Sequence, residues 1–145
     1  IIDPRNAFIM YDLLKEVIKN GTARKAKTLK RPDIAGKTGT TNDLMDAWFA
    51  GFNSDIVTVT WMGFDQPKSL GNKETGSRAA LPIWIDYMRP LLKDYPIKNL
   101  VKPEGIIPYK INKKTGMTNN ADENGFYEYF YEEYPPFDNS YFVIN

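Results

Sequence analysis

The chain has 145 residues, of which 42% are hydrophobic and 26% are charged, an ordinary balance for about one globular domain. Its formal net charge of +1 gives no overall case for a nucleic-acid-binding protein. It contains no cysteine and no histidine, which excludes a disulfide framework, a Ser-His-Asp triad and a His or Cys metal site within it. We expect neither a metal nor a cofactor.

A helix is predicted near the N-terminus. Asp3 offers a capping oxygen, and Pro4 suits a first helical turn, where no amide donor is needed. Apolar residues then recur along one helical face, at Ala7, Met10, Tyr11, Leu14, Val17 and Ile18. Asn20-Gly21 ends this pattern, and residues 22–31 are expected to form a basic loop.

Three antiparallel strands are predicted next, arranged as a meander. They are expected at residues 33–40, 47–52 and 56–64. Asn53-Ser54-Asp55 joins the last two strands as a hairpin. After a polar loop at residues 67–76, a second helix is expected over residues 77–93, with Pro90 kinking or ending it. Two helices that flank three sequential strands favour an α+β fold.

The last third of the chain has a different character. Pro103-Glu104-Gly105 opens a short strand that runs through Ile111, and Lys114-Thr115-Gly116 is expected to be a turn. Residues 119–125 are expected to be a loop. Residues 126–142 carry nine aromatic side chains interleaved with acidic ones, and we expect them to be extended and either docked through their rings or partly mobile.

The first predicted strand carries Lys37-Thr38-Gly39-Thr40 in a β-prone segment. Side chains alternate along a strand, so the two threonines share one face, and Lys37 and Gly39 share the other. On an unpaired strand edge, backbone amides can donate to a carbonyl, hydroxyls can bind a carboxylate, and a lysine favours developing negative charge. Gly39 also allows close approach to the backbone. The simpler interpretation of Lys-Thr-Gly alone is an edge strand whose polar side chains prevent aggregation.

The context of this motif resembles class A penicillin-binding proteins, the bifunctional peptidoglycan synthases of bacteria. Lys-Thr-Gly is a known signature of penicillin-binding proteins and serine β-lactamases. The matching segments are Asp33–Asn42, Asp46–Phe52, Val59–Asp65, Ile2–Ala7, Ala79–Trp84, Pro103–Ile106 and Phe126–Phe130. The resemblance implies that residues 1–95 form the C-terminal part of a transpeptidase domain of the penicillin-binding and serine β-lactamase-like fold, and that residues 96–145 form a C-terminal tail.

The resemblance also implies roles for the motif. Lys37 would lie near the catalytic serine and assist proton transfer. Thr38 and Thr40 would bind the carboxylate of the peptide or of a β-lactam, and Gly39 would keep the strand surface open to substrate. The backbone amide of Thr40 would donate to the oxyanion. No metal ligand is implied.

The chain departs from the family pattern because it lacks the serine nucleophile, its lysine base and the Ser-x-Asn element. Its serines are Ser54, Ser69, Ser77 and Ser140, none of which has a lysine three residues on or an asparagine two residues on. The chain also begins without an initiator methionine. We therefore expect this chain to be a piece of a longer protein. We also expect the chain to be inactive alone, because the nucleophile lies upstream of it.

The expected parent is a bacterial peptidoglycan D,D-transpeptidase that cross-links stem peptides through a serine acyl-enzyme, binds β-lactams and is fused to a glycosyltransferase. Its expected partners are a stem peptide or a β-lactam, the upstream part of the transpeptidase domain and other cell-wall synthesis proteins, but no nucleic acid. No stretch of the sequence approaches the roughly 18 apolar residues of a membrane span. We expect the parent protein to lie at the periplasmic face of the inner membrane, held there by an anchor in an upstream segment.

Two alternatives stay open. The chain could be a non-catalytic interaction module that docks through its tail and hairpin, or a fragment of a β-lactamase-like hydrolase, against which Thr40 and the family tail argue. The basic residues at 24–31 could bind nucleic acid, but a solvated loop fits the near-neutral net charge better. Three tryptophans are expected in the core, namely Trp48, Trp61 and Trp84.

Overall fold

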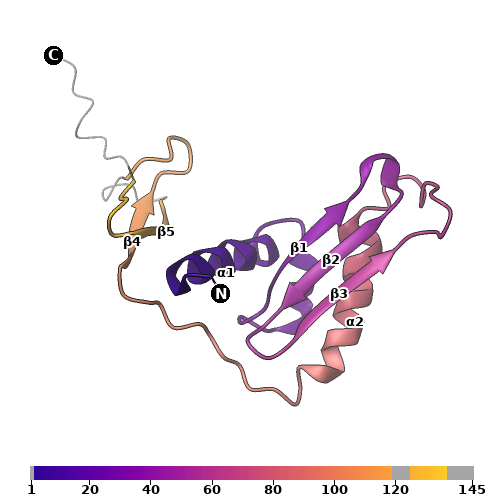
Figure 1. The fold of residues 1–145 in the computed structure, drawn as a ribbon, viewed down its shortest axis with the longest axis horizontal. Helices are drawn as coiled ribbons and strands as arrows, with labels where there is room; N and C mark the ends of the chain where they lie inside the picture. The colour runs from indigo at the N-terminus through magenta and orange to yellow at the C-terminus, as the bar shows by residue number, and fades with distance from the viewer. Residues whose placement is uncertain (1, 119–124, 137–145) are drawn as a thin grey trace. The chain divides into compact units, whose positions relative to one another are not determined.

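A computed structural model describes residues 2–118 and 125–136 (Figure 1). The chain divides into two compact units, one made of residues 10–100 and the other of residues 1–9 with 101–145. The first helix, α1 (Pro4–Lys19), contributes residues to both units.

A three-stranded antiparallel sheet forms the centre of the unit of residues 10–100. Its strands are β1 (Ala35–Thr40), β2 (Ala47–Phe52) and β3 (Val57–Met62), in the order β1-β2-β3. This confirms the predicted meander and the α+β class, with each outer strand shorter than expected. The register pairs Gly39 with Trp48, and Trp48 with Trp61 across β2 and β3.

The turn between β2 and β3 is stabilised by an asparagine side chain. Asn53 is buried, and its Oδ1 accepts hydrogen bonds from the N–H groups of Asp55 and Ile56 at 3.0 and 2.8 Å. Its backbone N–H donates to the carbonyl oxygen of Ile56. This side-chain turn explains why the short polar segment reverses the chain without a glycine.

One helix covers one face of the sheet (Figure 1). It consists of a π-helical turn, η3 (Gly76–Ala80), followed by α2 (Leu81–Leu91), so the predicted helix over residues 77–93 begins with a different helical turn and ends earlier. Pro90 lies in the last turn of α2, and the chain continues beyond Leu92 as turn and coil. Pro90 has no N–H to donate to the carbonyl oxygen one turn earlier, and its ring disfavours that turn, which agrees with the end of the helix one residue later.

The core lies between this helix and the sheet. Trp84 and Phe49 are fully buried, with ring centroids 5.0 Å apart in an edge-to-face arrangement. The indole N–H of Trp84 donates to the carbonyl oxygen of Thr58 at 3.1 Å, so its polar atom is satisfied. A Cβ on Gly51 would come within 2.6 Å of both rings, which explains the glycine at this position.

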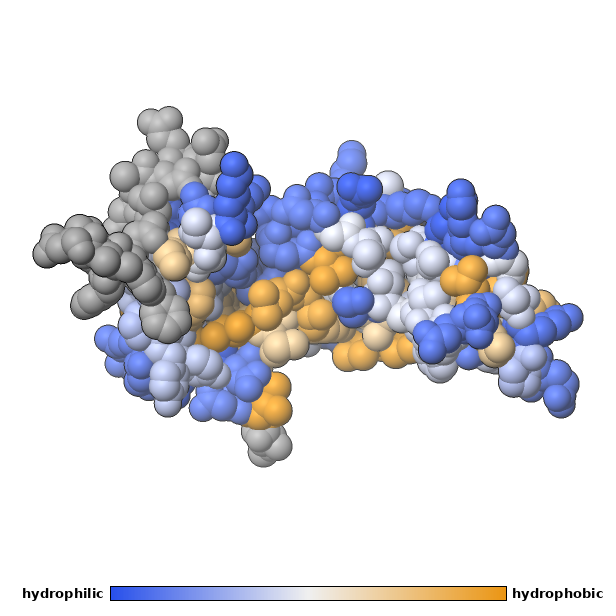
Figure 2. Space-filling model, turned by 90° about the horizontal axis from the view of Figure 1, so that it is seen from above, coloured by the Kyte–Doolittle hydropathy of each residue, from blue (hydrophilic) through white to orange (hydrophobic). Residues whose placement is uncertain are grey.

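The opposite face of the sheet presents exposed apolar side chains. Tyr11 of α1 contacts Phe52 at one end of this face, but Trp48, Val59 and Trp61 are 42%, 54% and 46% exposed. The prediction of three core tryptophans is therefore right for Trp84 and wrong for the other two, because alternation places them on the face that α2 does not cover. In the view of Figure 2, apolar residues (orange) also reach the surface, in patches among hydrophilic ones (blue).

Residues 22–31 are not simply the loop that the sequence predicts. A 3₁₀ helix, η1, spans Arg24–Leu29. Ala23 and Ala26 are both fully buried, whereas most of the basic side chains around them are exposed. The sequence prediction gave weight to the charges and missed the two small apolar residues that anchor the segment.

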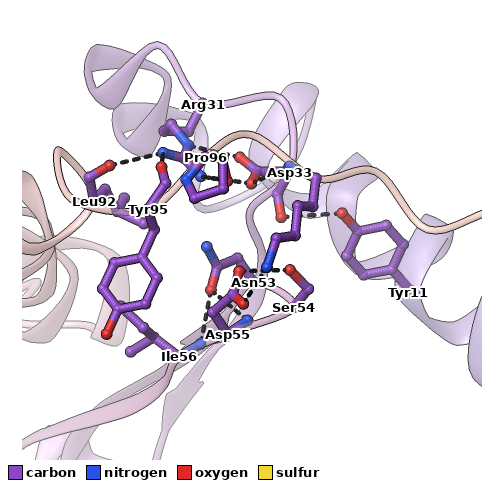
Figure 3. A network of polar contacts seen from close by, with 11 residues as sticks. Tyr11, Arg31, Asp33, Asn53, Ser54, Asp55, Ile56, Leu92, Tyr95 and Pro96 are labelled. Atoms are coloured by element: carbon purple, nitrogen blue, oxygen red, sulfur yellow. Dashed lines mark hydrogen bonds and ion pairs between the residues drawn. The ribbon is translucent and has the colours of Figure 1, made fainter.

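A buried ion pair connects the approach to β1 with the end of α2 (Figure 3). Arg31 donates to both carboxylate oxygens of Asp33 at 2.7 and 2.6 Å, and its remaining donors reach three backbone carbonyls, those of Leu92, Tyr95 and Pro96. Asp33 is fully buried and also accepts from the N–H of Lys98. Because the charges of Arg31 and Asp33 are paired and their polar atoms are hydrogen-bonded, these contacts offset the free-energy cost of removing the pair from water.

The other unit is built on a two-stranded antiparallel sheet. Its strands are β4 (Ile106–Ile111) and β5 (Phe126–Tyr131), which confirms the predicted strand ending at Ile111. The start of α1 packs here through Phe8, whose ring lies 5.0 Å from that of Tyr129. The extended structure predicted for residues 126–142 is seen as β5, and residues 119–124 and 137–142 lie outside the described residues.

Candidate functional site

The Lys37-Thr38-Gly39-Thr40 motif occupies the last four positions of β1, on an outer strand of the sheet. Within the described part of the chain, β1 pairs with β2 alone, so its second edge is free of strand pairing. The motif therefore combines a free strand edge with side chains on both faces.

Register assigns the motif residues to faces. Thr38 is opposite Phe49, whose side chain lies in the core beneath α2, so the two threonines are on the α2 side of the sheet. Lys37 and Gly39 are on the other side. The ammonium group of Lys37 is exposed and donates to the carbonyl oxygen of Thr38 at 2.9 Å.

The hydroxyl of Thr40 is engaged by the backbone. Its Oγ1 accepts a hydrogen bond from the N–H of Gly76 at 3.0 Å. A Cβ on Gly76 would lie 2.4 Å from the carbonyl oxygens of Gly39 and Trp48, so this approach of η3 to the sheet requires glycine. A threonine hydroxyl that accepts one bond still has its proton to donate, so Thr40 can bind an anion in this arrangement.

The hydroxyl of Thr38 also has a protein partner. Its Oγ1 lies 2.8 Å from the Oγ1 of Thr22, which follows the end of α1. Sequence reasoning missed Thr22, since nothing in the local pattern around Asn20-Gly21 distinguishes a site hydroxyl from an ordinary loop residue. The structure thus brings a third hydroxyl to the motif.

Gly39 is close to the neighbouring strand. A Cβ at this position would sit 3.1 Å from the Cβ of Trp48, tighter than ordinary van der Waals contact. The glycine is therefore favoured by packing against Trp48, in addition to any approach of a ligand. The two reasons predict the same residue, so glycine alone does not identify the motif as a site.

The described serines do not form a nucleophile with a lysine base. Ser54 donates to Asp55, Ser69 accepts from the N–H of Gly71, and the hydroxyls of Ser77 and Thr75 are 2.9 Å apart. Among residues 2–118 and 125–136, no group of three or more acidic side chains is placed to hold a metal ion. In the described part of the chain, the motif therefore offers hydroxyl groups and an ammonium group but has no serine–lysine pair beside it.

A separate cavity of about 570 Å³ lies between α1 and residues 27–34. Lysines line much of it, with the apolar side chains of Ile18, Pro32 and Ile34. The acidic residues in its lining are Asp12 and Glu16. None of the four motif residues lines this cavity, so the cavity and the motif are different features. We place the candidate site at the motif because a free strand edge and oriented hydroxyls converge there.

The chain is similar to known penicillin-binding proteins. It is 51% identical over 137 residues to penicillin-binding protein 1A of Pseudomonas aeruginosa, covering 94% of this chain and 17% of that protein. It is 56% identical over 106 residues to penicillin-binding protein 1A of Neisseria gonorrhoeae, covering 73% of this chain and 13% of that protein. The chain thus spans less than a fifth of the length of these curated relatives, and no family model matches it.

The fold is also similar to a solved structure. The crystal structure of penicillin-binding protein 1A from Haemophilus influenzae superimposes with a TM-score of 0.86 at 36% sequence identity. The match covers 94% of this chain and 21% of that chain. In the described part of the present chain, no helix has the length and apolar character of a membrane span.

Proposed function

This chain belongs to the family of class A penicillin-binding proteins, and we propose that it supplies the substrate-binding strand of a bacterial peptidoglycan D,D-transpeptidase. The proposed reaction cross-links stem peptides through a serine acyl-enzyme. A β-lactam would bind at the same strand as a mimic of the peptide terminus. The serine nucleophile and its lysine base belong, in this proposal, to a segment upstream of this chain.

One observation carries the proposal: β1 has an edge free of strand pairing, and it carries Thr38 and Thr40 near its end. The hydroxyl of Thr40 accepts a hydrogen bond from the protein, and that of Thr38 shares one. An extended peptide can lie along such an edge and pair with its backbone. The hydroxyls of Thr38 and Thr40 would then bind the terminal carboxylate. The backbone N–H of Thr40 would donate to the oxyanion that forms at the attacked carbonyl.

Lys37 has the remaining role in the proposal. Its ammonium group is exposed on the face opposite the threonines and is held by the carbonyl oxygen of Thr38. A positive charge here lowers the energy of negative charge that develops at the nucleophile and the oxyanion. Beside the upstream serine, it would also assist proton transfer. Gly39, between the two threonines, keeps the surface free of a side chain.

The proposal extends to the organisation of the whole protein. Residues 1–95 would belong to the transpeptidase domain and residues 96–145 to a C-terminal tail. The proposed partners are the upstream part of that domain, a peptidoglycan stem peptide and other cell-wall synthesis proteins. The proposed location is the periplasmic face of the inner membrane, with the anchor and a glycosyltransferase domain outside this chain.

Covalent labelling with a fluorescent penicillin tests this function. The full-length protein and the 145-residue chain are incubated with the probe, denatured and separated by gel electrophoresis. We expect a label on the full-length protein that unlabelled penicillin prevents, and no label on the chain alone. An unlabelled full-length protein contradicts the transpeptidase function. A labelled chain contradicts the proposal that the nucleophile lies upstream.

A further inference from the structure

We propose that Thr22 is a substrate-positioning residue, whose hydroxyl orients the hydroxyl of Thr38 toward the carboxylate of the acyl donor. The inference rests on the proposed function and adds a residue that lies outside the motif. It follows from the contact between the Oγ1 atoms of Thr22 and Thr38 at 2.8 Å.

The direction of this hydrogen bond follows from the chemistry of a hydroxyl. A hydroxyl has one proton to donate and two lone pairs that accept. If Thr38 donated its proton to Thr22, it would present only lone pairs to the ligand and would repel a carboxylate. Therefore, when an anion is bound, Thr22 must donate to Thr38, and Thr38 must donate to the anion. Aligned hydrogen bonds of this kind polarise one another and strengthen the last one.

The neighbouring hydroxyl supports this assignment independently. Thr40 accepts from the backbone N–H of Gly76, a donor that cannot reverse its role. The proton of Thr40 is thereby directed away from Gly76 and available to a ligand. Thr22 would donate a hydrogen bond to the hydroxyl oxygen of Thr38, as the backbone N–H of Gly76 does to that of Thr40. Both carboxylate-binding hydroxyls then have a lone pair occupied by the protein and a proton free.

The fold fixes the position of Thr22. The preceding Gly21 packs so closely that a Cβ would lie 2.8 Å from the Cα and carbonyl oxygen of Val17. The N–H of the following Ala23 donates to the carbonyl oxygen of Val17 at 3.1 Å, and Ala23 is fully buried. The backbone on both sides of Thr22 is therefore held against α1. The side chain of Thr22 is exposed, but its backbone is held in place, and this keeps its hydroxyl beside that of Thr38.

The inference predicts a specific kinetic effect. In the full-length protein, Thr22→Val removes the hydroxyl while keeping the branched shape. We expect the second-order rate constant for acylation by penicillin G to fall about three- to tenfold, the range for one net hydrogen bond. Thr22→Ser keeps the hydroxyl and should restore most of the rate. Thr28→Val is the matched control, because its hydroxyl bonds the carbonyl oxygen of Lys25 in η1, and its rate should equal wild type.

Two further arms separate a positioning role from a structural one. Penicillin G methyl ester lacks the free carboxylate, so its acylation rate should be the same in Thr22→Val as in wild type. In a double-mutant cycle, Thr22→Val should have no further effect in a Thr38→Val background. The inference is wrong if Thr22→Val lowers the acylation rates for the acid and the ester equally. It is also wrong if Thr22→Val lowers the rate of the Thr38→Val variant as much as it lowers that of wild type.

Failure of the inference can be told from failure of the proposed function. If the wild-type full-length protein is not acylated at all, the function itself is wrong. If the wild type is acylated and Thr22→Val matches it with penicillin G, only the role of Thr22 is overturned. Should Thr22→Val fail to fold, Thr22→Ala and Thr22→Ser provide the same comparison of a missing and a retained hydroxyl.

Discussion

Thr40 accepts a hydrogen bond from the backbone N–H of Gly76, a residue 36 positions away in the sequence. This contact joins the end of β1 to the first turn before α2. It gives the same threonine two tasks, since the hydroxyl satisfies a buried amide and, in our proposal, binds the substrate carboxylate. The Oγ1 atom of Thr40 thus connects the candidate site to the buried backbone at Gly76.

Replacing Thr40 with valine should reduce stability as well as binding. The buried N–H of Gly76 loses its acceptor in this variant, and an unsatisfied buried amide costs about 1–3 kcal/mol. Thr40→Ser keeps the oxygen and should lose less. Urea unfolding followed by tryptophan fluorescence measures the difference. Equal stability of Thr40→Val and wild type would contradict the coupling of site and core.

Stability should also fall in acid because of Asp33. Burial alone raises the pKa of this carboxyl, but hydrogen bonds from Arg31 and from the N–H of Lys98 outweigh burial and hold the pKa below its ordinary value. A carboxyl whose folded-state pKa is lowered stabilises the fold above the unfolded-state pKa, about 4, and loses this contribution as the pH falls through the folded-state pKa. The free energy of unfolding should therefore decrease below about pH 4.

Removing one partner of this pair provides the matching mutational test. Arg31→Ala leaves the carboxylate of Asp33 buried without its main partner, and should cost about 3–5 kcal/mol at neutral pH. Lys98→Ala is the control, because its ammonium group pairs with Asp55 at a more exposed position, and its loss should be smaller. Urea unfolding of both variants compares them. A larger loss in Lys98→Ala would contradict the assigned importance of the Arg31–Asp33 pair.

Lys37→Ala should slow acylation of the full-length protein by about 100-fold or more, the scale of a lost acid–base or electrostatic group. Lys73→Ala is the control, since Lys73 is an exposed residue of the loop before η3. The rate of covalent labelling by fluorescent penicillin measures both. If Lys37→Ala reacts as fast as Lys73→Ala, Lys37 has no part in the chemistry.

The three tryptophans should differ in their access to solvent in the 145-residue chain. Trp48 and Trp61 are 42% and 46% exposed, whereas Trp84 is fully buried. Iodide should therefore quench the fluorescence of the first two and leave that of Trp84 largely intact. A Trp84→Phe variant, which lacks the protected fluorophore, should be quenched more completely than wild type. Equal protection of all three would contradict the uncovered sheet face.

The sequence predicted the meander and the motif strand well because both depend on local patterns. A β-branched and aromatic run marks β3, and the Asn53-Ser54-Asp55 turn fixes its pairing with β2. The Lys-Thr-Gly motif then identifies β1. The alternation of side chains along β1 follows from strand geometry alone.

Other features depend on contacts that no local pattern contains. Alternation separates Trp48 from Phe49, but it does not say which face α2 covers, and so the sequence placed Trp48 in the core. The contact of Thr22 with Thr38 spans 16 positions and depends on how α1 ends beside β1. The buried alanines of the 22–31 segment were likewise hidden among basic residues.

A crystal structure of the full-length protein acylated by a penicillin tests the central claim most directly. The account predicts the carboxylate of the bound drug within about 3 Å of the hydroxyls of Thr38 and Thr40, and the drug's carbonyl oxygen at the N–H of Thr40. It predicts the acyl bond on a serine outside this chain. A drug carboxylate bound elsewhere, with both hydroxyls unoccupied, would contradict it.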